Sequence, residues 1–332
     1  MTEDLRTDAS TPRRVVLTQI ASTAWEHPAD RAALNTLRSL PGFDEVVRKV
    51  AGFFGERGIR QLFLANAVRV GPMQRPKLDA LYTEVLATFD SPTRPELYVT
   101  QTPFVNAAAV GFEHPFIVLN SGLIDLLDEE EQRDIIAHEL GHVMSGHATY
   151  STLAILLITI GVRNLPFLAG IALLPFQLAI MEWYRKAEFS ADRAGLLGTQ
   201  DPEKSLGVFL KLAGGDPRND TSSLDTFLAQ AQEYETDGGA WDTVLKILNT
   251  MFRTHPFATV RAAELQRWIQ SGEYERILRG DYPRRGDATT PPLGEDYADA
   301  AGYYGQQARD TFSAFSNSFD RARQAFNDAF KK

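Results

Sequence analysis

The sequence contains no cysteine among its 332 residues. This absence excludes disulfide bonds, thiolate zinc sites and cysteine nucleophiles, and it is compatible with a reducing compartment. Basic residues are fewer than acidic ones, the formal net charge is −9, and no long basic run occurs, so we do not expect a nucleic-acid binder. The first residues include acids and no apolar run of signal-peptide length. We therefore expect no signal peptide and a cytoplasmic location.

The residues that are present predict an α+β fold, mostly helical around a small sheet. Residues 1–90 are expected to form a helical N-terminal layer, because Leu34, Leu37 and Leu40 follow a helical spacing. Residues 96–120 are expected to form a small sheet, because β-branched and aromatic residues lie between turn signals there. Asp128 and the three glutamates after it predict the start of another helix. The main domain is expected over 91–282, a linker over 283–297 and an amphipathic C-terminal helix over 298–332.

The segment "IIAHELGHVMSGH", residues 135–147, is rich in histidine and lies on this expected helix. His138 and His142 are four residues apart and project from one helix face, so they can bind the same metal ion. Glu139 lies about 100° round the helix from His138, where it can hold a water molecule as a general base. His147 lies about 140° beyond His142, which favours a structural or supporting role. Gly141 costs about 1 kcal/mol of helix propensity and indicates that another element packs closely there.

A catalytic zinc ion usually takes three protein ligands, so a third ligand is expected elsewhere in the chain. The segment "AEFSAD" places Glu188 and Asp192 on one face of a later helix. Glu188 is the candidate third ligand, and Asp192 is a candidate for orienting a ligand histidine, most simply His138. The alternative is a pair of solvated acids beside Arg185 and Lys186.

Three segments, "AHELGHVMSGH", "RKAEFSAD" and "HPFATVR", resemble in this order the motifs of the HtpX-like and CAAX-prenyl-endopeptidase-like zinc metallopeptidases of the gluzincin class. The resemblance covers approximately residues 90–265. It implies a zinc metalloendopeptidase that holds one Zn²⁺ per chain through His138, His142 and Glu188 and uses Glu139 as the base.

The third of these segments supplies two further candidates. The resemblance implies that His255 donates a hydrogen bond in the transition state and that Arg261 assists it. The alternatives are a surface histidine beside Pro256 and an arginine that pairs with Glu264 or another nearby acid.

The stretch "NAAAVGFEHPFIVLNSGLI", residues 106–124, resembles the segment that supplies the family's active-site edge strand. We therefore expect an extended or unfolded polypeptide substrate that binds as an added strand. A competing hypothesis is a membrane-surface or partner-binding protein with a structural or inactive zinc site. The presence of Glu139 favours the enzyme.

Two apolar segments leave the location open. Residues 152–181 are nearly all apolar, but Arg163 and Asn164 divide them into pieces too short for two normal membrane spans. We expect a buried helical hairpin, with membrane-surface insertion or self-association as alternatives, although the resemblance implies membrane segments at this place. Residues 298–332 carry phenylalanines at helical spacing, which predicts a helix that packs on the main domain or binds a membrane surface or a partner.

Overall fold

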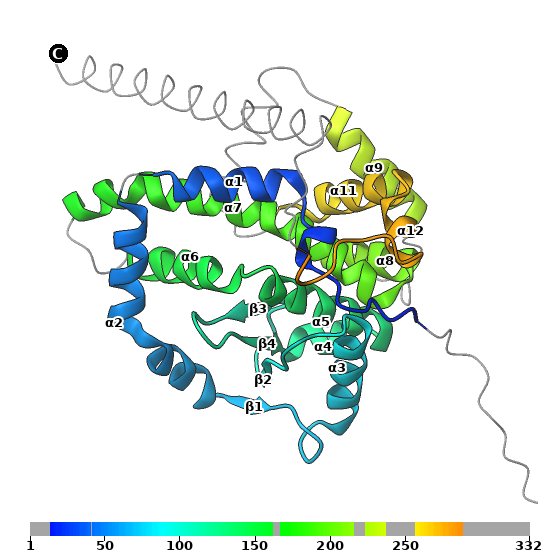
Figure 1. Cartoon of the computed structure of the whole chain (residues 1–332), viewed down its shortest axis with the longest axis horizontal. Coiled ribbons are helices and arrows are strands. Elements are labelled where there is room, and N and C mark those ends of the chain that lie inside the picture. The colour runs from blue at the N-terminus through cyan, green and yellow to red at the C-terminus, as the bar shows by residue number, and fades with distance from the viewer. Residues whose placement is uncertain (1–13, 41, 162–166, 216–222, 237–255, 288–332) are drawn as a thin grey trace, which may run out of the picture.

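A computed structural model describes residues 14–40, 42–161, 167–215, 223–236 and 256–287, which form helices around one four-stranded sheet (Figure 1). The strands are β1 (Ala67–Arg69), β2 (Glu96–Thr100), β3 (Ala107–Val110) and β4 (Phe116–Asn120). The helices are η1 (Ser22–Ala24), α1 (Pro28–Arg38), α2 (Phe43–Leu64), α3 (Pro76–Thr88), α4 (Ser121–Leu126), α5 (Glu129–Met144), α6 (Ala148–Gly161), α7 (Phe167–Thr199), α8 (Pro202–Leu212), α9 (Leu224–Thr236), α11 (Ala258–Gln270) and α12 (Glu273–Leu278). The predicted α+β fold class is confirmed.

The sheet has the strand order β1-β2-β4-β3. β2 and β4 are parallel, whereas β1 and β3 run antiparallel to their neighbours. β3 therefore forms one edge of the sheet, in the region where the sequence predicts an edge strand. β1 is an exception to the helical layer predicted for residues 1–90. Its three residues, Ala67, Val68 and Arg69, are too few to show an alternating pattern in the sequence. They form a strand because they pair with β2.

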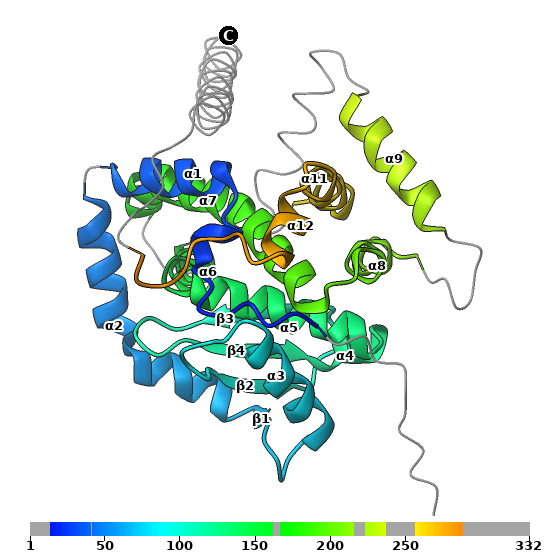
Figure 2. The same cartoon turned by 45° about the vertical axis from the view of Figure 1, so that its right-hand side comes forward.

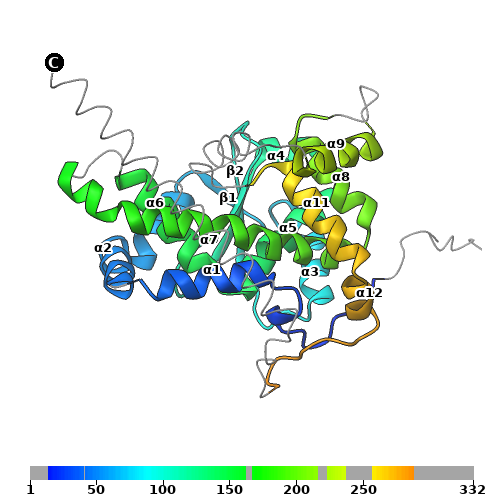
Figure 3. The ribbon, with the colours of Figure 1, turned by 90° about the horizontal axis from the view of Figure 1, so that it is seen from above.

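Helices α5 and α7 lie one above the other on the sheet, and α1 lies beside α7 (Figures 2 and 3). α5 packs against β3 and β4, α7 packs on the opposite side of α5, and α1 runs along α7. At one end of this stack α8 and α11 pack against α7, and α9 and α12 pack against α11 (Figures 1 and 3). Helix α5 is therefore enclosed between the sheet and α7, which buries its side chains almost all round.

Helix α5 begins at the residue that the sequence predicts. The Asp128 side chain accepts a hydrogen bond from the Glu131 amide at 3.0 Å, and the Glu131 carboxylate accepts one from the Asp128 amide at 2.8 Å. This capping box satisfies two amides that the first helical turn leaves without helical partners. The capping box therefore marks the start of α5.

Small residues bring α5 and α7 into close contact. A Cβ atom added at Gly141 would lie 2.5 Å from the Cβ of Ala194, and one added at Gly198 would lie 2.2 Å from the Cβ of Ala137. No larger side chain fits between the helices at these two points, because Cβ atoms do not approach so closely. The close packing predicted at Gly141 is confirmed.

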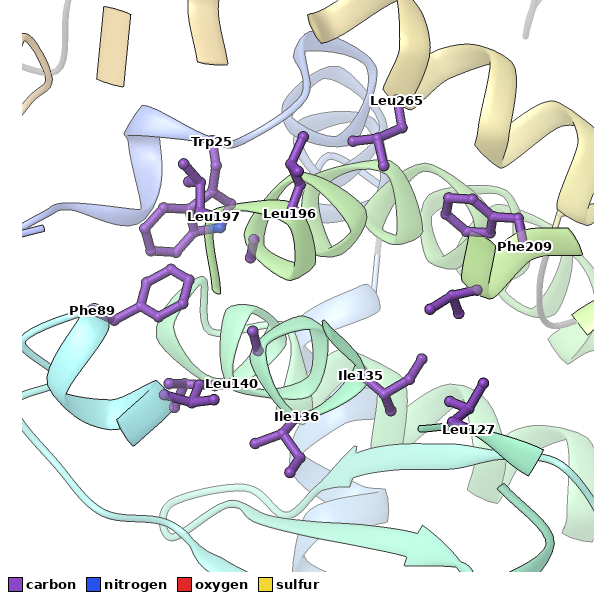
Figure 4. Close-up of a cluster of buried hydrophobic side chains, with 14 of the residues drawn as sticks. Trp25, Phe89, Leu127, Ile135, Ile136, Leu140, Leu196, Leu197, Phe209 and Leu265 are labelled. Atoms are coloured by element: carbon purple, nitrogen blue, oxygen red, sulfur yellow. The ribbon is translucent and has the colours of Figure 1, made fainter. Parts of the chain in front are cut away.

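A hydrophobic core surrounds this contact (Figure 4). Ile135, Ile136 and Leu140 of α5 and Leu196 and Leu197 of α7 belong to one buried cluster. Burying a side chain of this size contributes about 1.5–3 kcal/mol relative to leaving it exposed. The helix pair is thus held by apolar burial on both sides of its small-residue contact.

Most of the apolar stretch 152–181 lies outside the residues whose side chains the structure describes. At its two ends Leu153, Ala154 and Ile180 are buried together with Leu37 and Phe43. Among the described helices, none combines the length and the apolar character that crossing a membrane requires. The predicted C-terminal helix over 298–332, and residues 288–297 of the predicted linker, also lie outside the described residues.

The contact at Gly198 can be tested by Gly198→Ala. Alanine favours a helix by about 1 kcal/mol over glycine, but overpacking of a tight contact costs about 1–3 kcal/mol. We expect Gly198→Ala to lower the free energy of unfolding in urea denaturation. Gly207→Ala is the matched control, because the nearest heavy atom to an added Cβ there lies 4.0 Å away. The control should be neutral or stabilising, and equal stability of the two variants would contradict the close contact.

Candidate metal centre

Three side chains from α5 and α7 converge in the interior of the protein. His138 and His142 project from α5, Glu188 projects from α7, and one donor atom of each lies within 4.8 Å of the other two. Their exposed fractions are 4%, 4% and 0%. Two imidazoles and one carboxylate, brought together out of water, form a donor set suited to a transition metal such as zinc.

The distances between these donor atoms fit a tetrahedral ion. Glu188 Oε1 lies 3.2 Å from His142 Nε2, and Glu188 Oε2 lies 3.8 Å from His138 Nε2. Two ligand atoms about 2 Å from a tetrahedral zinc ion are about 3.3 Å apart. The three residues therefore lie close enough together to hold one zinc ion.

Asp192 contacts the ring nitrogen of His138 that faces away from Glu188. Asp192 Oδ1 lies 3.0 Å from His138 Nδ1, while Nε2 of the same ring faces Glu188. Burial alone lowers the pKa of His138, but the hydrogen bond to Asp192 and the charges of Glu188 and Asp192 outweigh burial and raise it. The sequence predicts Asp192 beside His138, and the structure places it there.

Arg261, on α11, lies behind the same two acids. Its Nε donates to Asp192 Oδ2 at 2.9 Å, and its Nη1 lies 3.3 Å from Glu188 Oε2. Burial raises the pKa of Asp192, but Arg261 and His138 together bring it below its usual value, so the carboxylate stays ionised. Arg261 thus joins α11 to the site through Asp192 and Glu188. Its predicted assistance to the transition state stays a prediction.

His142 is held from behind by another histidine. Nδ1 of His142 lies 3.1 Å from Nδ1 of His147, while Nε2 of His142 faces Glu188. Burial lowers the pKa of His142 to about 4, which keeps its imidazole neutral near pH 7. Neutral imidazole is the form that binds metals. His147 therefore has the supporting position predicted from its place on the helix.

Glu139 follows His138 on α5 and is buried, with an exposed fraction of 4%. Its position beside one candidate ligand suits a base for an attacking water. His255, the candidate transition-state donor, lies outside the described residues.

Asp30 was not identified from the sequence, although it lies in this region of the structure. Its Oδ2 is 3.1 Å from Nε2 of His147. An aspartate in the first turn of a helix is common because it favours the positive end of the helix dipole, so the sequence gives no signal of a second role.

The comparisons with known proteins agree with this geometry. The family described as peptidase family M48 matches residues 72–269. The plastoglobule-localized metallopeptidase 48 of Arabidopsis thaliana, a chloroplast protein, is 33% identical over 261 residues, which cover 77% of this chain and 75% of that protein. A protease HtpX homolog of Moorella thermoacetica is 26% identical over 266 residues, covering 70% and 85% of the two chains. One of Ralstonia pickettii is 26% identical over 254 residues, covering 67% and 83%. No solved structure matches significantly.

Replacing Glu188 tests the ligand set. Glu188→Ala should weaken zinc binding by more than the roughly 10–100-fold typical for the loss of a supporting residue, because it removes a ligand itself. The zinc affinity can be measured by competition with a chelator. Glu182→Ala is the control, since Glu182 lies on the same helix and pairs with Arg185 instead. Wild-type zinc affinity in Glu188→Ala would rule out this ligand.

Proposed function

The chain belongs to peptidase family M48 and is a protease, and we propose that it cuts extended protein segments with a zinc ion held by His138, His142 and Glu188. The observation that carries the proposal is the approach of the Glu188 carboxylate to both His Nε2 atoms, with the buried Glu139 next to His138 in the sequence of α5. The competing hypothesis of a non-catalytic binding protein gains no support from the relatives, whose names are those of proteases.

The proposed mechanism is the hydrolysis of a peptide bond by water, without a covalent intermediate. When bound, zinc supplies a Lewis acid that polarises the scissile carbonyl and makes the water more acidic. Glu139 accepts the proton of the attacking water and delivers it to the leaving amine. Asp192 keeps the His138 ring oriented, and Arg261 keeps both acids in place. His255 is the proposed donor to the negative charge that develops on the carbonyl oxygen.

We propose that the substrate binds along strand β3. This strand is at an edge of the sheet, and it packs against α5, the helix that carries Glu139. An extended peptide added to this edge would form main-chain hydrogen bonds that tolerate many side chains. This binding mode supports a substrate class of extended or unfolded segments.

We also propose that the protein binds a membrane surface peripherally. The proposal rests on the apolar stretch 152–181 and on the phenylalanines of 298–332. One relative is named for its location at plastoglobules. Self-association through the same segments is the alternative.

Glu139→Gln tests the proposed reaction. Glutamine has nearly the same shape as glutamate but cannot accept the proton, so hydrolysis of casein should fall by about 10²–10⁴-fold. The zinc content, measured by atomic absorption, should stay at one ion per chain because Glu139 is not a ligand. Full casein hydrolysis by Glu139→Gln would exclude the proposed mechanism.

Membrane attachment can be tested by washing membranes from expressing cells. A peripheral protein should be released by carbonate, whereas an integral protein needs detergent. Deleting residues 298–332 should weaken membrane attachment and leave the hydrolysis of soluble peptides unchanged, because every proposed site residue precedes this segment. If the full chain resists carbonate, the peripheral proposal is wrong.

A further inference from the structure

A chain of buried hydrogen bonds runs from the candidate ligand His142 to helix α1. Nδ1 of His142 lies 3.1 Å from Nδ1 of His147, and Nε2 of His147 lies 3.1 Å from Oδ2 of Asp30. His147 and Asp30 each have an exposed fraction of 2%. Helix α1 precedes residues 72–269, which match the peptidase family, so the chain of contacts reaches outside that segment.

Asp30 itself is fixed by helix α7. Its Oδ1 accepts a hydrogen bond from Trp183 Nε1 at 2.9 Å, and its Oδ2 accepts one from Ser190 Oγ at 2.6 Å. Ser190 Oγ in turn accepts a hydrogen bond from the His27 amide at 2.8 Å, which holds the start of α1 on α7. A buried carboxylate held by two donors has a fixed position and can set the position of a third group.

Along this row of hydrogen bonds, only one placement of the protons leaves His142 able to bind a metal. An ionised carboxylate only accepts hydrogen bonds, so His147 Nε2 donates to Asp30. His142 Nε2 faces Glu188 and must carry no proton as a ligand, so the proton of His142 is on Nδ1. When His142 binds a metal, its Nδ1 therefore donates to Nδ1 of His147, and His147 carries a single proton, on Nε2.

We propose that Asp30 is a positioning residue of the metal centre, which acts through His147 to hold His142 in the orientation and tautomer that present Nε2 to the ion. The proposal rests on the proposed zinc-dependent function. Each ligand histidine then has a carboxylate behind it: Asp192 contacts His138 directly, and Asp30 reaches His142 through His147. A carboxylate that accepts a hydrogen bond from a ligand histidine also makes the other ring nitrogen of that histidine more basic, so this nitrogen binds the metal more strongly.

The test uses the full-length protein and two readouts other than activity. One is the dissociation constant for zinc, from competition with a chromophoric chelator, and the other is the visible spectrum of the cobalt-substituted protein, which reports the ligand geometry. Asp30→Asn should weaken zinc binding by about 10–100-fold and change the cobalt bands. The control is Glu131→Gln, which alters another buried carboxylate whose partners are Lys211 and the Asp128 amide. The control should leave both readouts unchanged.

A second variant keeps the proposal testable if Asp30→Asn does not fold. His147→Gln should weaken zinc binding by a similar factor. If Asp30 acts through His147, adding Asp30→Asn to His147→Gln should cause little further loss. Three results would overturn the proposal. They are a wild-type zinc affinity and spectrum in either single variant, additive losses of affinity in the double variant, and an equal loss of affinity in Glu131→Gln. If the wild-type protein binds zinc and cleaves casein but the variants are unaffected, only the role of Asp30 is refuted. If the wild-type protein binds no zinc, the proposed function is refuted as well.

Discussion

The close contact between α5 and α7 is the constraint on which the site depends. His138 and His142 are on one helix and Glu188 is on the other, so their donor atoms meet only if the two helices approach closely. Gly141 and Gly198 permit this approach, because an added Cβ at either position would collide with an alanine of the facing helix. Each glycine costs about 1 kcal/mol of helix propensity, and the apolar cluster around the contact offsets this cost.

The site buries negatively charged carboxylates, and a positive charge from a neighbouring helix compensates them. Glu188 is fully buried, and an unpaired buried carboxylate would be strongly destabilising. Arg261 from α11 lies beside Glu188 and Asp192, and Asp192 contacts His138. Arg261 and Asp192 therefore hold the candidate ligands in place, and the charge of Arg261 compensates that of Glu188. This explains why α11, remote in sequence from α5, packs against α7 at this place.

The features predictable from the sequence were those carried by local spacing. Neighbouring residues alone were enough to predict the helical spacing of His138 and His142, the cap at Asp128 and the sheet over 96–120. Asp30 and the pairing of β1 could not be predicted, because each depends on a contact between segments far apart in the chain. Arg261 was singled out through a motif, but its two acidic partners are visible only in the folded chain. The roles of His255 and of residues 298–332 stay predictions, since both lie outside the described residues.

The most direct test of the account is a crystal structure of the purified protein with anomalous diffraction measured on both sides of the zinc absorption edge. We expect one zinc peak per chain, about 2.0–2.2 Å from His138 Nε2, His142 Nε2 and a carboxylate oxygen of Glu188. Glu139 should lie beside the ion without binding it. A zinc peak on His147 or His255, or a zinc ion bound without Glu188, would contradict the idea that the contact of α5 and α7 builds the metal centre.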